Sequence, residues 1–225
     1  MRGWGVAIAA AAALMPVAAR ADNDPQEWTT LSATVKLDDH WRAQEELVFR
    51  FSDKRQGLYE IESNTLIGYA LDKHITVWAG YTHDPQYEAD DFTVMEHRAR
   101  EQVTFDNIAK VLGGSVSARM RVETRWREGI DGTAWRIRPY VKFVRPFHEG
   151  GKTSLVLSHE SFIDLNATPF QRREGEERMR NLIAISTKLD KHTTAEFGYL
   201  NQQNFVDTGE AEDDHVLSIS LAFAY

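Results

Sequence analysis

The sequence predicts an all-β protein: an antiparallel transmembrane β-barrel of 10–12 strands that follows a cleaved N-terminal signal peptide. Apolar and polar residues alternate with a period of two, over segments of about ten residues, the length with which a tilted strand crosses a bilayer. After the N-terminus no apolar run is long enough for a transmembrane helix. Because every backbone polar group must be paired within lipid, an exported protein with this pattern is expected to close into a barrel.

The export signal is expected over residues 1–21. Arg2 supplies a positive charge, residues 6–14 form a short apolar run, and Ala19 and Ala21 give a small-x-small cleavage site. An uncleaved anchor helix is the alternative, but the apolar run is too short to span a membrane. We therefore expect the mature chain, residues 22–225, to be a single outer-membrane barrel domain.

The first part of the mature chain shows two hairpins. Strands are expected at residues 28–37, 41–51, 60–71 and 75–83. Asp-x-His turns starting at Asp38 and Asp72 connect them in pairs, because an Asp side chain bonds its own backbone in tight turns. Residues 84–93 are rich in acidic side chains and are expected to form a loop.

The remaining segments continue the same alternation. Strands are expected at residues 94–105, 115–126, 134–144, 153–162, 178–189, 193–202 and 215–225, with long charged loops at residues 163–177 and 203–214. A third Asp-x-His turn begins at Asp190. This makes eleven recognisable strands. Because single-chain bacterial barrels have an even number of strands, twelve is the expected count and ten the second choice.

Alternation alone does not say which face of the strands points inward. Three features favour apolar residues outside, as in a membrane barrel. Aromatic residues lie near strand ends, as in the girdles at membrane interfaces. The apolar faces include Ala and Thr rather than only bulky residues. The last strand alternates up to a terminal aromatic residue, through Leu217, Ile219, Leu221, Phe223 and Tyr225.

That C-terminal pattern resembles the signal by which outer-membrane proteins reach their assembly machinery. We therefore expect a bacterial outer-membrane location. The expected partners are outer-membrane lipid, lipopolysaccharide and the assembly machinery, and the barrel is expected to be monomeric. The net charge of -8 argues against nucleic-acid binding.

The opposite faces of the middle strands carry charges that would line the lumen. The ladder consists of Glu96, Arg98, Arg100, Arg119, Arg121, Glu123, Arg125, Arg136, Arg138, Lys142, Glu160, Arg178 and Arg180. These charges have two interpretations. They pair with one another and close the barrel, since an unpaired buried charge is costly, or they line a narrow passage for small polar or anionic solutes.

Several segments carry a resemblance to a known family. They are Trp28, EHRAREQVTF at 96–105, RMRVETRW at 119–126, WRIRPYVKFVRPF at 135–147, SHESF at 158–162 and RMRN at 178–181. With them the chain resembles the bacterial family known as domain of unknown function 2490, over essentially the whole mature chain. The resemblance implies an outer-membrane barrel and no assigned biochemical role.

Two other functions remain open. A soluble periplasmic, lipocalin-like barrel that binds an apolar ligand would have the reverse facing, with Val141, Leu155 and Leu157 inside and Arg136 and Arg138 in water. A lipid-modifying hydrolase embedded in the barrel would need a nucleophile, a base and an orienting group.

The tetrapeptide Ser158-His159-Glu160-Ser161 contains the residue types for such a hydrolase. Alternation places His159 on the opposite face from Ser158 and Glu160, so these three cannot form a triad. A triad formed across strands remains open, but no such set is visible in the sequence. We expect no catalytic residues and no enzyme activity.

Metal and cofactor sites are not expected either. His40, His74 and His192 lie in the Asp-x-His turns, where turn formation explains them. The acidic clusters at residues 88–91 and 210–214 match no calcium-loop spacing and are interpreted as solvated loops. No nucleotide-binding fingerprint is present.

Overall fold

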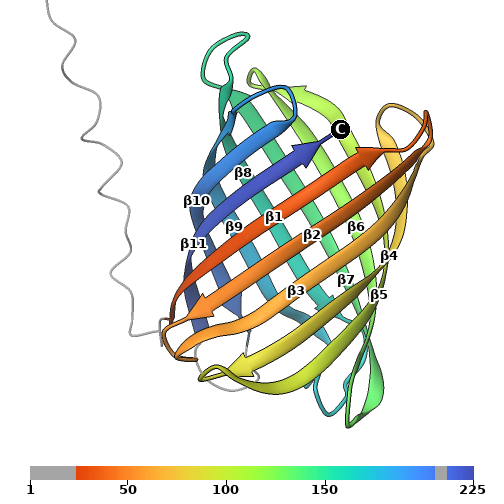
Figure 1. Cartoon of the computed structure of the whole chain (residues 1–225), viewed down its shortest axis with the longest axis vertical. Coiled ribbons are helices and arrows are strands. Elements are labelled where there is room, and N and C mark those ends of the chain that lie inside the picture. Colours follow the sequence, from red (N-terminus) through yellow and green to blue (C-terminus); the bar gives the residue numbers. More distant parts are fainter. Residues whose placement is uncertain (1–23, 206–211) are drawn as a thin grey trace, which may run out of the picture.

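A computed structural model of the chain describes residues 24–205 and 212–225, and the predicted signal peptide with Ala19 and Ala21 lies outside this range. The described residues form eleven strands (Figure 1). Their bounds are β1 Asp24–Lys36, β2 Trp41–Ser52, β3 Gly57–Ala70, β4 Ile75–Glu88, β5 Asp91–Val111, β6 Gly114–Arg127, β7 Ile130–Pro146, β8 Thr153–Asp164, β9 Gly175–Lys188, β10 Thr193–Asn204 and β11 Glu212–Ala224. No described helix is long and apolar enough to cross a bilayer.

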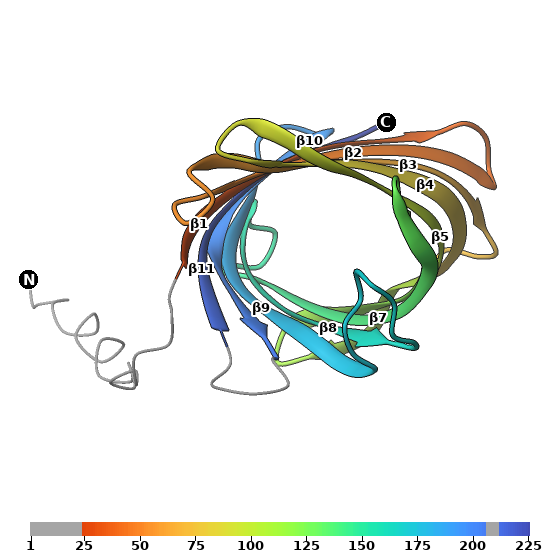
Figure 2. The ribbon, with the colours of Figure 1, turned by 90° about the horizontal axis from the view of Figure 1, so that it is seen from below.

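The strands close into one cylinder, seen as a complete ring in Figure 2. Consecutive strands pair antiparallel, and β1 pairs with β11 in parallel, from Asp24 opposite Asp214 to Thr34 opposite Ala224. The expectation of twelve or ten strands is therefore wrong, and so is that of a purely antiparallel barrel. With an odd number of alternating strands the first and last run in the same direction, so the closing pair must be parallel.

The two ends of the barrel differ. The turns after β1, β3, β5, β7 and β9 lie at the end that holds the C-terminus, called here the turn end (Figure 1). The opposite end, called the loop end, holds Asp24 and the longer connection between β8 and β9. The acidic loop expected at 84–93 is not a loop, because β4 and β5 extend as a hairpin and leave only Ala89 and Asp90 between them. Both residues have positive φ, the conformation that tight hairpin turns require.

The strand faces point as expected for a charged lumen. On β7, Arg136 and Arg138 are 4% and 5% exposed, whereas Trp135 and Val141 are 46% and 44% exposed. The facing that a lipocalin-like barrel requires is therefore absent, because its apolar residues would have to point inward. The C-terminal strand has the same facing, with Leu217 42% exposed and Val216 fully buried.

Some carboxylates lie on the outer surface, among them Glu45 and the exposed Glu101. Glu45 on β2 points outward, where it accepts hydrogen bonds from the hydroxyls of Ser63 (2.8 Å) and Thr65 (2.6 Å) on β3. These two bonds satisfy the carboxylate on a surface that is otherwise mostly apolar.

The three Asp-x-His turns share one hydrogen-bond pattern. Asp38, Asp72 and Asp190 each accept bonds from the backbone N–H groups two and three residues later, at 2.7–2.8 Å. The following His then reaches a backbone carbonyl of the neighbouring strand. The Nδ1 atoms of His40, His74 and His192 contact the carbonyl oxygens of Ala70 (3.1 Å), Asp106 (2.7 Å) and Ala224 (2.6 Å). The histidines therefore tie each hairpin to the next strand.

The turns make a pH-dependent contribution to stability. The N–H groups of His74 and Ile75 hold the pKa of Asp72 below its usual value of 3.8. A carboxyl with a lowered folded-state pKa stabilises the fold above its unfolded pKa and loses this effect as the pH falls through the folded one. We expect Asp72→Ala to lower the unfolding midpoint by a few degrees at neutral pH and to have little effect near pH ~2. Thermal unfolding in detergent measures this, with Lys73→Ala in the same turn as control. An equal effect at both pH values would contradict it.

Candidate functional site

The lumen is crossed by a dense network of buried ion pairs. At its centre Arg138 on β7 contacts two carboxylates from the flanking strands. Its Nη1 lies 2.6 Å from Glu123 Oε1 on β6, and its Nε and Nη2 each lie 3.1 Å from the two oxygens of Glu160 on β8. Arg119 and Arg121 on β6 extend the cluster, to Glu160 and Glu123 respectively. Such two-pronged pairing fixes the direction of the guanidinium as well as its charge.

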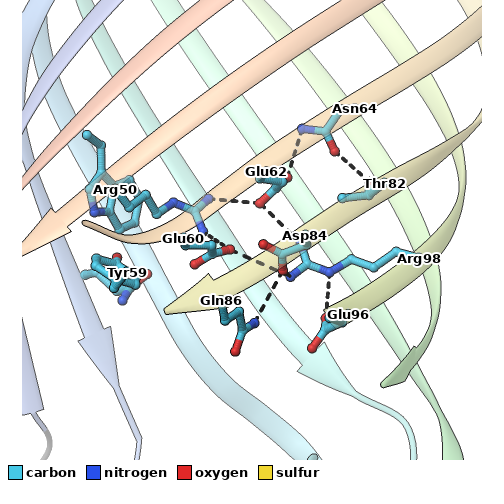
Figure 3. A network of polar contacts seen from close by, with 12 residues as sticks. Arg50, Tyr59, Glu60, Glu62, Asn64, Thr82, Asp84, Gln86, Glu96 and Arg98 are labelled. Atoms are coloured by element: carbon cyan, nitrogen blue, oxygen red, sulfur yellow. Dashed lines mark hydrogen bonds and ion pairs between the residues drawn. The ribbon is translucent and has the colours of Figure 1, made fainter. Parts of the chain in front are cut away.

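A second cluster, drawn in Figure 3, joins β2, β3, β4 and β5 around Arg98. The guanidinium lies 2.7 Å from Glu96, 3.2 Å from Glu62, 3.8 Å from Glu60 and in close contact with Asp84. All four carboxylates have at most 10% of their side chain exposed. Asp84 was not among the residues predicted to line the lumen, although alternation along β4 places it on the inward face.

Arg50 on β2 completes this cluster from the other side. Its Nη2 lies 3.1 Å from Glu62, and its Nη1 contacts Glu60 (Figure 3). The early strands therefore supply carboxylates to the arginine-rich middle strands.

Glu96 accepts bonds from three arginines. Besides Arg98, Arg125 reaches its carboxylate at 2.8 and 3.1 Å and Arg127 at 2.6 Å. The Glu96 side chain is fully buried. Glu96 therefore joins arginines of β5 and β6, of which Arg98 is shared with three further carboxylates.

Aromatic rings separate the arginines within the lumen. The guanidinium carbons of Arg138, Arg180, Arg136 and Arg178 lie 4.2, 4.6, 5.4 and 5.4 Å from the ring centre of Phe162. Arg180 also lies 4.4 Å from the ring of Trp28, so it bridges the two rings. A ring face attracts a cation, which makes close packing of like charges tolerable. Phe162 was not predicted as a lumen residue, although it lies two residues after Glu160 on β8 and therefore on the same face.

A cavity of about 790 Å³ lies at the loop end of the lumen. Its basic lining residues outnumber its acidic ones. The basic residues are Arg50, Lys54, Arg55, Arg98, Arg125, Arg127, Arg136, Arg138, Arg172, Arg173, Arg178 and Arg180. The acidic residues are Asp24, Glu60, Glu62, Asp164, Glu177, Glu212 and Asp214. We call this cavity the vestibule; four of its arginines, Arg98, Arg125, Arg127 and Arg138, also pair with carboxylates that do not line it.

The β8–β9 connection covers part of the vestibule. Gln171 in this connection is buried, accepts a bond from Arg125 (2.9 Å) and donates to the backbone carbonyls of Asn166 (2.7 Å) and Trp135 (3.1 Å). Phe170 lies under Arg127, 5.2 Å from its guanidinium carbon. The segment expected as a long charged loop is therefore partly an ordered cap over the lumen.

Every residue of the predicted charged ladder points into the lumen. Lys142 lies nearest the turn end, 3.4 Å from Glu196 of β10, while Arg178 pairs with its neighbour Glu177 at 2.6 Å. Ser158 and Glu160 share the inner face, and His159 and Ser161 lie on the outer one. Among the described residues no cluster of His, Asp or Glu could hold a metal ion.

Comparisons with known proteins give a family but no activity. The family model described as protein of unknown function (DUF2490) matches residues 26–213. An uncharacterized protein of Methylorubrum extorquens is 29% identical over 160 residues, which cover 71% of this chain and 70% of that protein. No solved structure matches.

The central cluster makes a large contribution to stability. Replacing Arg138 with Met would leave Glu123 and Glu160 with less compensation in a buried site, and breaking a buried pair in this way costs about 3–5 kcal/mol. We expect Arg138→Met to lower the free energy of unfolding by this amount, measured with denaturant in detergent. Arg145→Met, at an exposed position of the same strand, is the control. Equal stability of the two variants would contradict a structural role for the network.

Proposed function

Since this chain belongs to the DUF2490 family, whose function is unknown, we propose that it is an outer-membrane barrel with a self-paired lumen and an anion-binding vestibule. The observation that carries this proposal is the facing of the strands. Arginine and glutamate side chains are buried inside, while large apolar side chains on the outside remain exposed. A soluble protein rarely leaves such an extended apolar surface in water, whereas a bilayer would cover it.

The outer surface also has aromatic residues near both ends. Trp41, Tyr69 and Tyr225 lie at the turn end, and Trp126 and Trp135 lie at the loop end. Two such belts suit the two interfaces of a membrane. In this proposal residues 1–21 are removed on export, and the alternating C-terminal strand is read by the assembly machinery.

The short turns support an orientation in the membrane. Periplasmic turns of bacterial barrels are short and external loops longer. We therefore assign the turn end to the periplasm and the vestibule to the external side, next to lipopolysaccharide. The barrel acts as a monomer in this proposal, because closure leaves no strand edge for a second copy.

A closed lumen fits the ion pairs better than an open passage. Arg138 is held by two carboxylates and Glu96 by three arginines, and all of these groups are buried. An ion that passed through would have to break such pairs. The vestibule, in contrast, has an excess of arginine and enough volume for a small anion.

Membrane residence is tested by fractionation. The mature chain should remain in the outer-membrane fraction after osmotic shock and need detergent for release. Its mobility in electrophoresis should change on heating, as expected for a stable barrel. Release in soluble form by osmotic shock would exclude the proposal.

Lumen closure and anion binding need separate measurements. In planar bilayers we expect no steady conductance, since the lumen charges pair with one another. A steady anion-selective current would mean that the lumen is an open passage and not closed. Titration of the detergent-solubilised barrel with inorganic phosphate should give heat of binding that decreases at high salt.

The vestibule variant is Arg55→Glu, with Lys73→Glu at the turn end as a control of the same charge change. Arg55 lines the cavity and stacks on Tyr59 at its rim. We expect the first change to weaken phosphate binding by roughly tenfold, equivalent to about 1.4 kcal/mol, and the second to leave it unchanged. Equal effects of both variants would reject the vestibule as the site.

A further inference from the structure

Three polar residues form a hydrogen-bonded relay on the outer surface of β8 and β9. His159 Nδ1 lies 2.8 Å from Asn181 Oδ1, and His159 Nε2 lies 3.2 Å from Ser161 Oγ. His159 and Ser161 are two residues apart on β8, and Asn181 lies directly opposite His159 on β9. All three alternate with buried lumen residues and therefore face outward.

The partners of the imidazole define its proton positions. An amide oxygen accepts hydrogen bonds only, so the contact with Asn181 places the imidazole proton on Nδ1. In the neutral imidazole Nε2 then carries no proton and can accept the hydroxyl proton of Ser161. This is the arrangement in which a histidine activates a serine while a third group orients the ring.

An apolar groove begins beside His159. It has a volume of about 260 Å³, and its apolar walls come from Phe105, Ala118, Met120, Pro139 and Val141 on β5, β6 and β7. Pro139 has no backbone N–H, and the pairing of β7 with β8 is interrupted there, between Ile137–Ile163 and Tyr140–Glu160. Ser161 lies on β8 within this interruption, so the groove and the serine are next to each other.

The position of the relay on the barrel also points to a ligand with a polar and an apolar part. Toward the turn end the next outward row is Leu157, Ile183 and Leu217, with Tyr199 among them. The row of the relay continues instead with Asn201 and His215, both polar. The relay therefore lies where the apolar surface of these strands gives way to a polar one.

We propose that Ser161, His159 and Asn181 form an esterase site for the carboxylic esters of acyl chains, with the chain lying in the adjacent groove. Ser161 and His159 are the catalytic residues and Asn181 is a positioning residue. This goes beyond the anion-binding vestibule, which lies inside the barrel, and replaces the expectation of no enzyme activity. The esterase site depends neither on a solute in the lumen nor on closure of the lumen.

The reaction balances with water as the only co-reactant. Ser161 Oγ attacks the ester carbonyl carbon while His159 Nε2 takes its proton. The bond from the carbonyl carbon to the alcohol oxygen then breaks, and His159 donates the proton to that oxygen. Water attacks the acyl-serine, gives one proton to His159, and releases the fatty acid as the proton returns to Ser161 Oγ. One ester and one water become one acid and one alcohol.

The sequence interpretation missed this site for a definite reason. The consecutive residues Ser158, His159 and Glu160 lie on two faces of a strand. The serine that meets His159 is two residues along on the same face, and the orienting amide comes from the neighbouring strand. Only the register of β8 with β9 brings Asn181 to that position.

The experiment uses the folded mature chain in detergent and two probes. A fluorophosphonate reports a nucleophilic serine by covalent labelling, and p-nitrophenyl butyrate together with phosphatidylcholine micelles reports ester hydrolysis. We expect one label per chain, located at Ser161 by mass spectrometry, and hydrolysis of at least one ester. Ser161→Ala should lose both label and hydrolysis, and His159→Asn should slow both by roughly 10²- to 10⁴-fold.

Ser158→Ala is the matched control, because it removes the same group from the inner face of the same strand. It should keep both label and activity. Heat-modifiable mobility confirms that each variant is folded. No label and no hydrolysis in the folded wild-type chain would overturn the proposal, and so would equal activity of Ser161→Ala and Ser158→Ala.

The role of Asn181 needs a readout beyond loss of activity. Asn181→Ala should lower the labelling rate, and Asn181→Asp should restore it, because a carboxylate oxygen also accepts the Nδ1 proton. Asn181→Asp should further shift the pH profile of labelling upward, since a nearby negative charge favours protonated imidazole. An unchanged rate and pH profile in both variants would remove Asn181 from the site. Failure of membrane fractionation would leave labelling of Ser161 unaffected, so the two proposals fail separately.

Discussion

The structure depends on the cost of a charge that has no partner in the interior of the barrel. Leaving a buried guanidinium or carboxylate uncompensated costs several kcal/mol, so most inward arginines contact a carboxylate or an aromatic face, and Arg100 instead bonds the side-chain oxygens of Asn64 and Thr82. Arg138 does so through Glu123 and Glu160, and Arg98 through carboxylates of three strands. These contacts join neighbouring strands at fixed positions and therefore help to set the register of the sheet.

The same constraint explains why the inner face is not uniform. Carboxylates from β3 to β6 and from β8 balance arginines from β5 to β7 in the middle of the lumen. Toward the loop end arginines exceed carboxylates, and Phe162, Phe170 and Trp28 take part of the compensation through their ring faces. The middle of the lumen is therefore closed by ion pairs, while the vestibule at the loop end has more basic than acidic lining residues.

The outer face obeys a different rule, because apolar residues prevail there. Several polar groups on this face are bonded to one another. Glu45 bonds Ser63 and Thr65, Tyr199 Oη lies 2.6 Å from His215 Nδ1, and His159 bonds Ser161 and Asn181. The first two sets satisfy polar groups in an apolar surface. The third differs from them in its neighbouring groove and in its chain of serine, imidazole and amide.

The amino-acid sequence by itself determined the features that depend on near neighbours. The alternation of residues defined the strands, the Asp-x-His pattern defined three turns, and the parity of Arg136 and Arg138 against Trp135 defined two faces, because each of these arises within one strand or one turn. The tertiary structure decided the rest. Closure fixed eleven strands with a parallel seam, and the register between strands chose which carboxylate meets Arg98 and which amide meets His159, since such pairs join residues that are far apart in the chain.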